Sequence, residues 1–197
     1  MNTNTSIKIL LIDDEDFDVE RVKNTVSVFS NRIFIEDVVS NGKAALEILH
    51  TKPDCHDVVI LDYHISGGLR GEELIREIKL IDPFIQIIVI TKMTINLTDF
   101  AFANNLLKAG AFWYCTKYPG NIEEFIYQPT DFVLSIFNAY EKKKLEKQKV
   151  KSDKRLMKNI EGILAQLFNS PKFVRDDFVE LAHSTIPEVK KAAEAKL

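Results

Sequence analysis

Two short apolar runs that each end directly at aspartate constrain the fold of this chain more than any other feature. One run spans Ile7 to Ile12 and is followed by Asp13-Asp14, and the other spans Val58 to Leu61 and is followed by Asp62. Short, continuous apolar runs are typical of parallel strands that are buried on both faces. Because open α/β sheets bind ligands at the carboxyl ends of their strands, we expect the three carboxylates to meet in one crevice.

Carboxylates that lie this close together cannot all ionise cheaply unless a cation lies between them. Mg²⁺ is the most plausible hard divalent cation, because it binds carboxylate, carbonyl and water oxygens. The pattern therefore predicts a Mg²⁺ site formed by Asp13, Asp14 and Asp62. The alternative is that the aspartates cap the helices that follow, which is a common role for one aspartate but explains all three together less well.

Apolar runs alternate with helical spacings through the first 140 residues. Five β-α units of this length predict an α/β fold, in which a parallel sheet carries helices on both faces. Right-handed crossovers leave few alternatives to a flavodoxin-like, doubly wound sheet. We expect the second helix to open at Asn41-Gly42, the fourth to close at Gly110 and the fifth to start at Pro129 or Thr130. The expected strands are 7–12, 33–38, 58–61, 85–90 and 111–116.

Charge is distributed unevenly along the chain. Residues 1–140 carry a net charge of −8, whereas residues 141–158 carry nine basic and three acidic residues, a net charge of +6. We therefore expect a globular domain over residues 1–140, a basic helical linker that continues the fifth helix over residues 141–158, and a small tail over residues 159–197. Helical apolar spacings in the tail predict an all-helical extension.

Other features favour a reducing, cytoplasmic setting without a membrane partner. The chain lacks a basic-then-apolar signal segment, and no apolar stretch approaches membrane-spanning length. Cys55 and Cys115 have no neighbours at the spacing of zinc ligands. We interpret Cys115 and Trp113 as core residues of the last expected strand.

Polar residues stand at the ends of four expected strands: Ile12 to Glu15 after the first strand, Leu61-Asp62 after the third, Ile90-Thr91 after the fourth and Thr116-Lys117 after the fifth. With these residues, the segment from residue 6 to about 140 resembles a receiver domain of a two-component response regulator. Each position alone is a weak signal, but four polar positions at four strand ends, in this order, form a specific set. The resemblance implies a five-stranded sheet with the strand order 2-1-3-4-5.

The resemblance also implies the role of each residue at the crevice. Asp62 would accept a phosphoryl group from a phosphohistidine on a histidine kinase or phosphotransfer protein. Asp14, with Asp13 partly through water, would hold Mg²⁺ together with Asp62 and the backbone carbonyl of His64. Lys117 would contact a phosphoryl oxygen. Such a protein assists its own phosphorylation and dephosphorylation and is not an enzyme.

A conformational switch is implied by the same resemblance. The Thr91 hydroxyl would bind another phosphoryl oxygen and draw its loop inward, which would leave space for Tyr114 to rotate. Lys92 follows Thr91 where receivers usually carry a small residue, and this cation could shield the phosphoryl group. Ser66 replaces a proline that is usual in the family. The glycine that usually follows is Gly71, one residue further along the chain than in most receivers.

The output of such a protein is left open between several alternatives. The helical tail could bind a downstream protein, and residues 186–193 are similar to the start of a HEAT-type helix. The fourth and fifth helices could form a homodimer. The basic linker could instead contact DNA in a transcriptional regulator, although a solvated charged helix explains it more simply. A Mg²⁺-dependent phosphohydrolase is the alternative from another class, but the alternating acid pair and the separate general acid of such enzymes are absent.

Overall fold

A computed structural model describes residues 6–92, 100–117 and 129–168 of the chain. The chain divides into two compact units, residues 1–147 and residues 148–197. The first unit contains a five-stranded parallel sheet with the strand order β2-β1-β3-β4-β5, as expected. The strands are β1 (Ile7–Ile12), β2 (Ile33–Val39), β3 (Val58–Asp62), β4 (Gln86–Thr91) and β5 (Trp113–Thr116).

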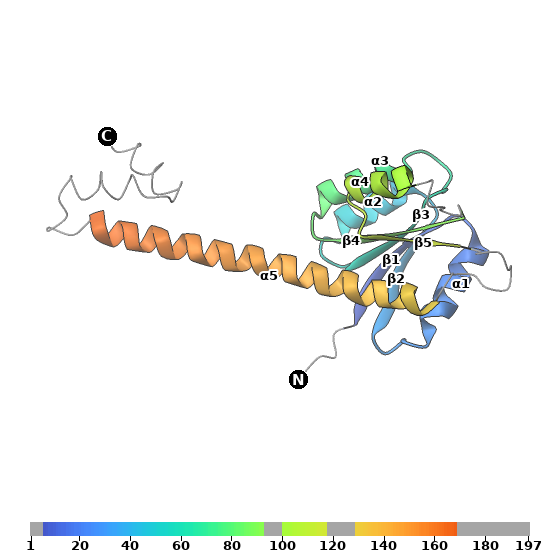
Figure 1. Cartoon of the computed structure of the whole chain (residues 1–197), viewed down its shortest axis with the longest axis horizontal. Coiled ribbons are helices and arrows are strands. Elements are labelled where there is room, and N and C mark those ends of the chain that lie inside the picture. The colour runs from blue at the N-terminus through green and yellow to red at the C-terminus, as the bar shows by residue number, and fades with distance from the viewer. Residues whose placement is uncertain (1–5, 93–99, 118–128, 169–197) are drawn as a thin grey trace. The chain divides into compact units, whose positions relative to one another are not determined.

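Helices cover both faces of this sheet (Figure 1). The start of α5 and the whole of α1 lie on one face, and α2, α3 and α4 lie on the other. The helices are α1 (Asp16–Ser27), α2 (Gly42–Thr51), α3 (Gly71–Ile81), α4 (Phe100–Ala109) and α5 (Pro129–Phe168). The predicted flavodoxin-like fold is confirmed.

The two faces explain why β1 is apolar throughout. Ile9 and Leu11 pack with the cluster beneath α1 and α5, whereas Leu10 and Ile12 pack with the cluster beneath α2, α3 and α4. Each of these four side chains is fully buried. A strand covered on both sides has no solvated face, so alternation of apolar and polar residues is lost.

Local sequence signals place the helix ends correctly. The Asn41 side chain accepts a hydrogen bond of 2.9 Å from the backbone N–H of Ala44 and so caps α2. Gly110 follows α4 with a φ of +115°, a left-handed conformation that favours glycine at a helix end. α5 begins at Pro129, one of the two expected starts. The interpretation of Trp113 as a core residue is wrong, because the residue is 50% exposed.

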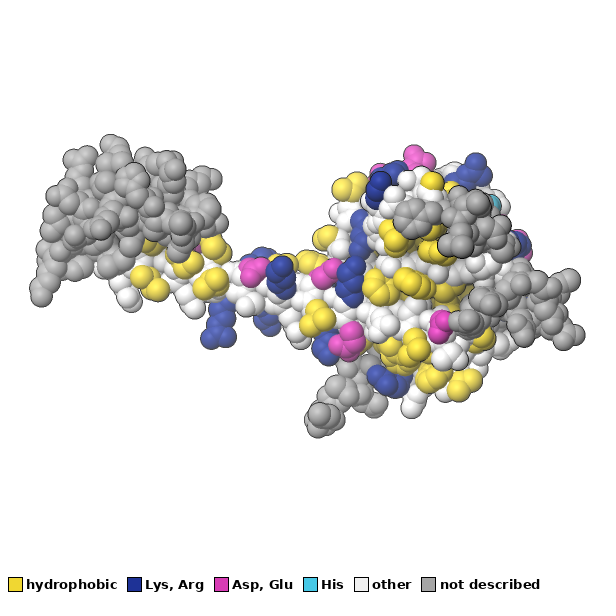
Figure 2. Space-filling model, in the orientation of Figure 1, with side chains coloured by type: hydrophobic (Ala, Val, Ile, Leu, Met, Phe, Trp, Pro, Cys, Tyr) yellow, Lys and Arg dark blue, Asp and Glu magenta, His cyan; other side chains and the backbone are white. Residues whose placement is uncertain are grey.

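α5 is one continuous helix to Phe168, so the boundaries expected at residues 140 and 158 both lie inside it. The division into domain, linker and tail stays a prediction, and residues 169–197 with the HEAT-like phrase lie outside the described residues. Figure 2 shows basic and acidic side chains interspersed along α5. Among the residues that the structure describes, no helix combines the length and hydrophobicity needed to cross a bilayer.

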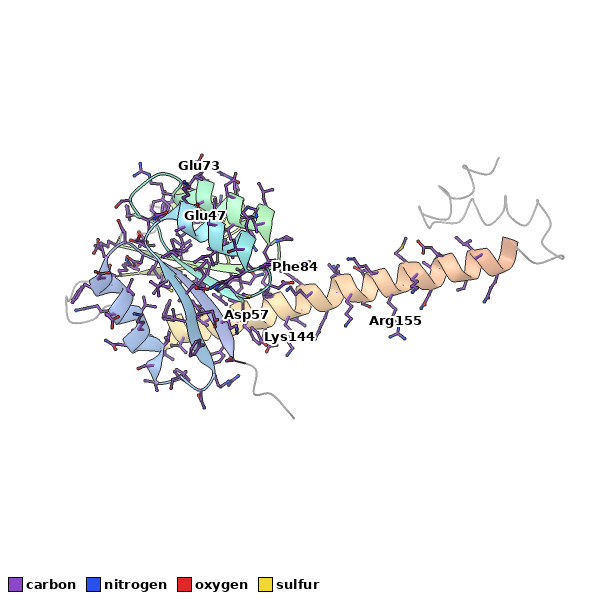
Figure 3. All side chains as sticks on the ribbon, turned by 180° about the vertical axis from the view of Figure 1, so that it is seen from behind. Glu47, Asp57, Glu73, Phe84, Lys144 and Arg155 are labelled. Atoms are coloured by element: carbon purple, nitrogen blue, oxygen red, sulfur yellow. The ribbon has the colours of Figure 1, made fainter. Side chains whose placement is uncertain are left out.

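Part of the basic stretch belongs to the first unit. Lys143 is buried and donates a hydrogen bond to the backbone carbonyl of His56, and its Nζ lies 3.5 Å from Asp82 and 3.7 Å from Asp57. Lys147 pairs with Asp54 one turn further along. Figure 3 labels Asp57 and Phe84, which precede β3 and β4 at the amino ends of these strands, and Lys144 on the adjacent part of α5. The first turns of the basic stretch are thus fixed to the loops that precede β3 and β4.

Candidate functional site

The central strands bring the predicted acids together. β1 and β3 are neighbours in parallel register, with Ile12 opposite Leu61, so the residues that follow them lie at the same edge of the sheet. On the other side of β1, the backbone N–H of Asp13 donates to the carbonyl of Val39, so the pairing of β1 with β2 continues to Asp13. Carboxylate oxygens of Asp13, Asp14 and Asp62 all lie within 4.8 Å of one another. This group could hold a metal ion.

Lys117 contacts this group from the end of β5. Its Nζ lies 2.8 Å from Oδ2 of Asp13, 2.8 Å from Oδ2 of Asp18 and 3.2 Å from Oδ2 of Asp62. The side chain is fully buried, and burial by itself would lower the pKa of a lysine. The hydrogen bonds to Asp13 and Asp18 and the charge of Asp62 outweigh burial, and they raise the pKa of Lys117 above its ordinary value.

The two aspartates that follow β1 have pKa values shifted in opposite directions. Burial raises the pKa of Asp13, even though the hydrogen bond from Lys117 and the one from the Glu15 backbone work against it. A hydrogen bond from the Ser66 hydroxyl lowers the pKa of Asp14, and the Ser66 backbone N–H adds a second bond of 3.1 Å. Ser66, which marks a departure from the usual receiver sequence, therefore holds a predicted metal ligand.

The remaining predicted residues lie on neighbouring elements. Thr91 is fully buried at the carboxyl end of β4, and its carbonyl accepts a 2.6 Å hydrogen bond from the backbone N–H of Lys117. Tyr114 is half-buried on β5 and packs against the cluster beneath α2, α3 and α4. The backbone N–H of His64 donates to Asp62 at 3.3 Å, while the role of the His64 carbonyl stays a prediction.

Helix capping does not explain these aspartates. The N-cap residue of α1 is Glu15 and that of α3 is Arg70, and neither makes a side-chain capping hydrogen bond. Asp13 accepts from the Glu15 backbone at 3.0 Å, but it does so beside its contact with Lys117. Asp13 and Asp62 therefore contact the Lys117 ammonium, and Asp14 contacts Ser66, rather than a helix end.

Sequence reasoning missed Asp18, which is fully buried on α1 and touches Lys117 as closely as Asp13 does. The signal was available, since Asp18 lies beside Val19 and one turn before Val22 on the buried face of an amphipathic helix. An acid on such a face needs a partner. The ion pair between Lys92 and Glu15, across the loops after β4 and β1, was also not foreseen.

Comparisons with known proteins agree with this geometry. The family model described as "Response regulator receiver domain" matches residues 9–126. A response regulator receiver domain protein from Clostridium thermocellum is 31% identical with a TM-score of 0.56, and the match covers 71% of this chain and 98% of that one. No curated protein matches the sequence.

More distant solved structures share the fold. A CheY-like receiver domain protein from Methanospirillum hungatei is 19% identical with a TM-score of 0.54, and the match covers 72% of this chain and 99% of that one. A CheX–CheY–BeF₃–Mg²⁺ complex from Borrelia burgdorferi contains a chain that is 18% identical with a TM-score of 0.57. The match covers 69% of this chain and 90% of that one.

The fold and the acidic crevice define a signalling domain of two-component systems. The chain belongs to the response regulator receiver domain family. Domains of this family accept a phosphoryl group in signal transduction and bind Mg²⁺ at an acidic pocket. The Asp cluster of this chain has the composition that such a pocket requires.

Proposed function

We propose that this protein accepts a phosphoryl group on Asp62 and changes its output surface in response. The observation that carries the proposal is the position of Asp62, which is almost fully buried, belongs to the acid group and lies 3.2 Å from the Lys117 ammonium. An acceptor carboxylate needs a nearby cation, because negative charge builds up on the phosphoryl oxygens during transfer.

The proposed reaction is transfer from a phosphohistidine of a histidine kinase or phosphotransfer protein. A carboxylate oxygen of Asp62 forms a bond to phosphorus while the bond between phosphorus and the imidazole nitrogen breaks. The imidazole nitrogen keeps the electron pair and takes up a proton. Lys117 donates a hydrogen bond to one phosphoryl oxygen and the Thr91 hydroxyl to another.

The acid group fits Mg²⁺ in its ligand chemistry. Asp14, Asp13 and Asp62 would hold the ion together with the backbone carbonyl of His64 and water. When bound, Mg²⁺ neutralises charge on the phosphoryl oxygens. The protein then acts as a phospho-acceptor rather than an enzyme that turns over a separate substrate.

The proposed switch uses the contact between β4 and β5. The backbone N–H of Lys117 donates a hydrogen bond to the Thr91 carbonyl, and Tyr114 lies on β5 three residues before Lys117. Movement of Thr91 toward the phosphoryl group would give Tyr114 room to turn inward, and this would alter the surface of α4, β5 and α5. A second copy of the chain or a downstream protein bound through the C-terminal helical region would sense that change.

DNA binding through residues 141–158 gains no support from the structure. Two of its lysines, Lys143 and Lys147, already pair with acids of the first unit. The Lys143 ammonium is buried and so cannot face a phosphate backbone, whereas the Lys147 side chain is 38% exposed.

The test is incubation of the full chain with a small phosphodonor and Mg²⁺. We expect the wild type to gain one phosphoryl group that is stable in acid and labile to base and hydroxylamine, as an acyl phosphate is. Asp62→Asn should gain none. Asp16→Asn is the matched control, because it removes an exposed acid from α1 close to the crevice and should be phosphorylated like the wild type.

Two results would contradict the proposal. Phosphorylation of Asp62→Asn to the same extent as the wild type would show that another residue is the acceptor. Repeated turnover of a generic phosphate ester, with no stable phosphoprotein, would favour the phosphohydrolase alternative.

A further inference from the structure

Ser66 binds the predicted metal ligand Asp14 through two of its own groups. Its backbone N–H donates a hydrogen bond of 3.1 Å to Oδ2 of Asp14, and its hydroxyl donates a second hydrogen bond to the same oxygen. Ser66 belongs to the loop between β3 and α3 (residues 63–70), whereas Asp14 belongs to the loop after β1. The contact therefore fixes the Asp14 side chain to a segment other than the strand that it follows.

The two bonds determine which oxygen of Asp14 is offered to a metal ion. A carboxylate oxygen has about two lone pairs, and the two donors of Ser66 use this capacity on Oδ2. Oδ1 is then the oxygen that Asp14 can offer beside Asp13 and Asp62. Hydrogen-bond partners of this kind orient metal ligands in proteins and strengthen metal binding.

The other two acids of the group are held in a different way. Asp13 and Asp62 are almost fully buried and contact the Lys117 ammonium. Asp14 is the most exposed of the three acids. Its direction is therefore set by Ser66 rather than by close packing, and loss of the Ser66 hydroxyl should leave the carboxylate freer to turn.

The same contact holds one end of the loop between β3 and α3. Gly67 and Gly68 follow Ser66 with φ angles of +83° and +114°. At the other end of the loop, the Leu69 carbonyl lies so close to Gly42 that a Cβ atom at Gly42 would be 2.5 Å from the carbonyl oxygen. The loop is thus tied to the crevice at Ser66 and to the start of α2 at Leu69. An ion that fixes Asp14 would also fix the crevice end of this loop.

We propose that Ser66 is a positioning residue that holds Asp14 in the orientation that binds Mg²⁺ and thereby ties the loop between β3 and α3 to the bound ion. The two effects are linked: if the contact with Ser66 strengthens metal binding, metal binding must strengthen the contact by the same factor. The inference rests on the proposed binding of Mg²⁺ by the acid group. It does not depend on phosphoryl transfer to Asp62. Because Ser66 lies four residues after Asp62, the ion orders the segment beside the acceptor before a phosphoryl group is bound.

The first test measures the affinity of the full chain for Mg²⁺ by calorimetry. Ser66→Ala removes the hydroxyl and keeps the backbone N–H, and we expect it to bind Mg²⁺ about fivefold more weakly than the wild type. This effect is smaller than is usual for partners of metal ligands, because Ser66 is exposed. Ser66→Thr keeps both donors and should bind Mg²⁺ like the wild type. Ser27→Ala is the matched control, since it removes a hydroxyl that donates to the Asn24 carbonyl, and it should leave the affinity unchanged.

The second test follows hydrogen exchange of the backbone amide at position 66 by NMR. In the wild type, we expect saturating Mg²⁺ to slow this exchange by about fivefold, the factor that linkage requires. In Ser66→Ala the effect of Mg²⁺ on the same amide should be smaller. A merely structural role of the hydroxyl would change stability without making this amide respond to Mg²⁺.

Equal or tighter binding of Mg²⁺ by Ser66→Ala would overturn the inference, as would binding by Ser66→Thr that is as weak as that of Ser66→Ala. Unchanged or faster exchange of the Ser66 amide with Mg²⁺ would also overturn it, because the hydrogen bonds would then not support the bound ion. If both tests succeed but the wild type gains no phosphoryl group, the inference stands and the proposed role of Asp62 is wrong. If the wild type binds no Mg²⁺, both the inference and the proposed metal site are wrong.

Discussion

The Nζ of Lys117 lies 3.2 Å from Oδ2 of Asp62, and the two side chains are 0% and 2% exposed to solvent. The same ammonium contacts Asp13 and Asp18, so one cation serves three carboxylates in a space with almost no solvent access. The stability of the carboxyl edge of the sheet should therefore depend on Lys117 whenever no metal ion is bound.

Replacing Lys117 with methionine tests this dependence. Methionine keeps much of the side-chain volume but leaves buried carboxylates without their shared cation. We expect Lys117→Met to lower the free energy of unfolding by about 3 kcal/mol in the absence of divalent ions, measured by urea denaturation. The control Lys92→Met changes an exposed lysine of the same crevice and should shift stability by less than about 0.5 kcal/mol. Equal stability of Lys117→Met and wild type would show that the carboxylates do not need the ammonium.

Mg²⁺ should stabilise the folded protein through the acid group. A ligand that binds only the folded state at 100 times its dissociation constant stabilises it by about 2.7 kcal/mol. We therefore expect Mg²⁺ to raise the melting temperature of the wild type, and Asp14→Asn to lose most of this increase. Asp16→Asn has the same change of charge outside the group and should retain it. An undiminished response of Asp14→Asn would remove Asp14 from the proposed ligands.

The sequence alone was sufficient to predict the fold and most of the acid group. A strand such as β1, covered on both faces, must be apolar along its whole length, and this property is visible without coordinates. Asp13 follows β1 directly and Asp62 is the last residue of β3, and parallel neighbours end at the same edge of a sheet. The acids lie close together because the strand order places their strands side by side, and this strand order follows from the apolar runs along the sequence.

Residues whose environment depends on distant segments were not predictable in this way. Lys143 lies in a run of charges that is typical of a solvated helix, and only the position of the loops before β3 and β4 makes it buried. Trp113 belongs to a short strand whose one partner strand among the described residues is β4, and the residue is 50% exposed. Asp18 is a different case, since its place on the buried face of α1 was visible in the sequence but an aspartate in the first turn of a helix also has an ordinary explanation in the helix dipole.

Ser66 gives the site a pH dependence. A carboxyl group whose pKa is lower in the folded than in the unfolded protein contributes stability above its ordinary pKa, and this contribution is lost as the pH falls through the folded value. For Asp14 the ordinary value is 3.8, and the Ser66 hydroxyl is the main cause of the lowering. We expect Ser66→Ala to be less stable than the wild type at pH 7, by less than about 1 kcal/mol because Asp14 is largely solvated.

The difference between these two proteins should shrink as the pH falls below 3.8, in urea denaturation without divalent ions. Ser27→Ala is the matched control, since the Ser27 hydroxyl donates to the backbone carbonyl of Asn24, which does not titrate. Its effect on stability should be the same at pH 7 and pH 3. A pH-independent effect of Ser66→Ala would show that its hydroxyl acts on something other than the charge of Asp14.

Lys143 and Lys144 are adjacent in sequence but differ sharply in environment, and this difference tests where the receiver ends. The Lys143 side chain is 4% exposed and binds the His56 carbonyl between Asp57 and Asp82, whereas that of Lys144 is 45% exposed. We expect Lys143→Met to lower the free energy of unfolding by about 2 kcal/mol, because a buried carbonyl and two acids lose their donor. Lys144→Met should change it by less than about 0.5 kcal/mol.

Urea denaturation of the first unit measures both free energies of unfolding. If the two variants are equally stable, residues 141–147 belong to the linker expected over residues 141–158. If only Lys143→Met is destabilised, the receiver extends through Lys147, and any output that uses α5 begins from a segment that already contacts the loops before β3 and β4.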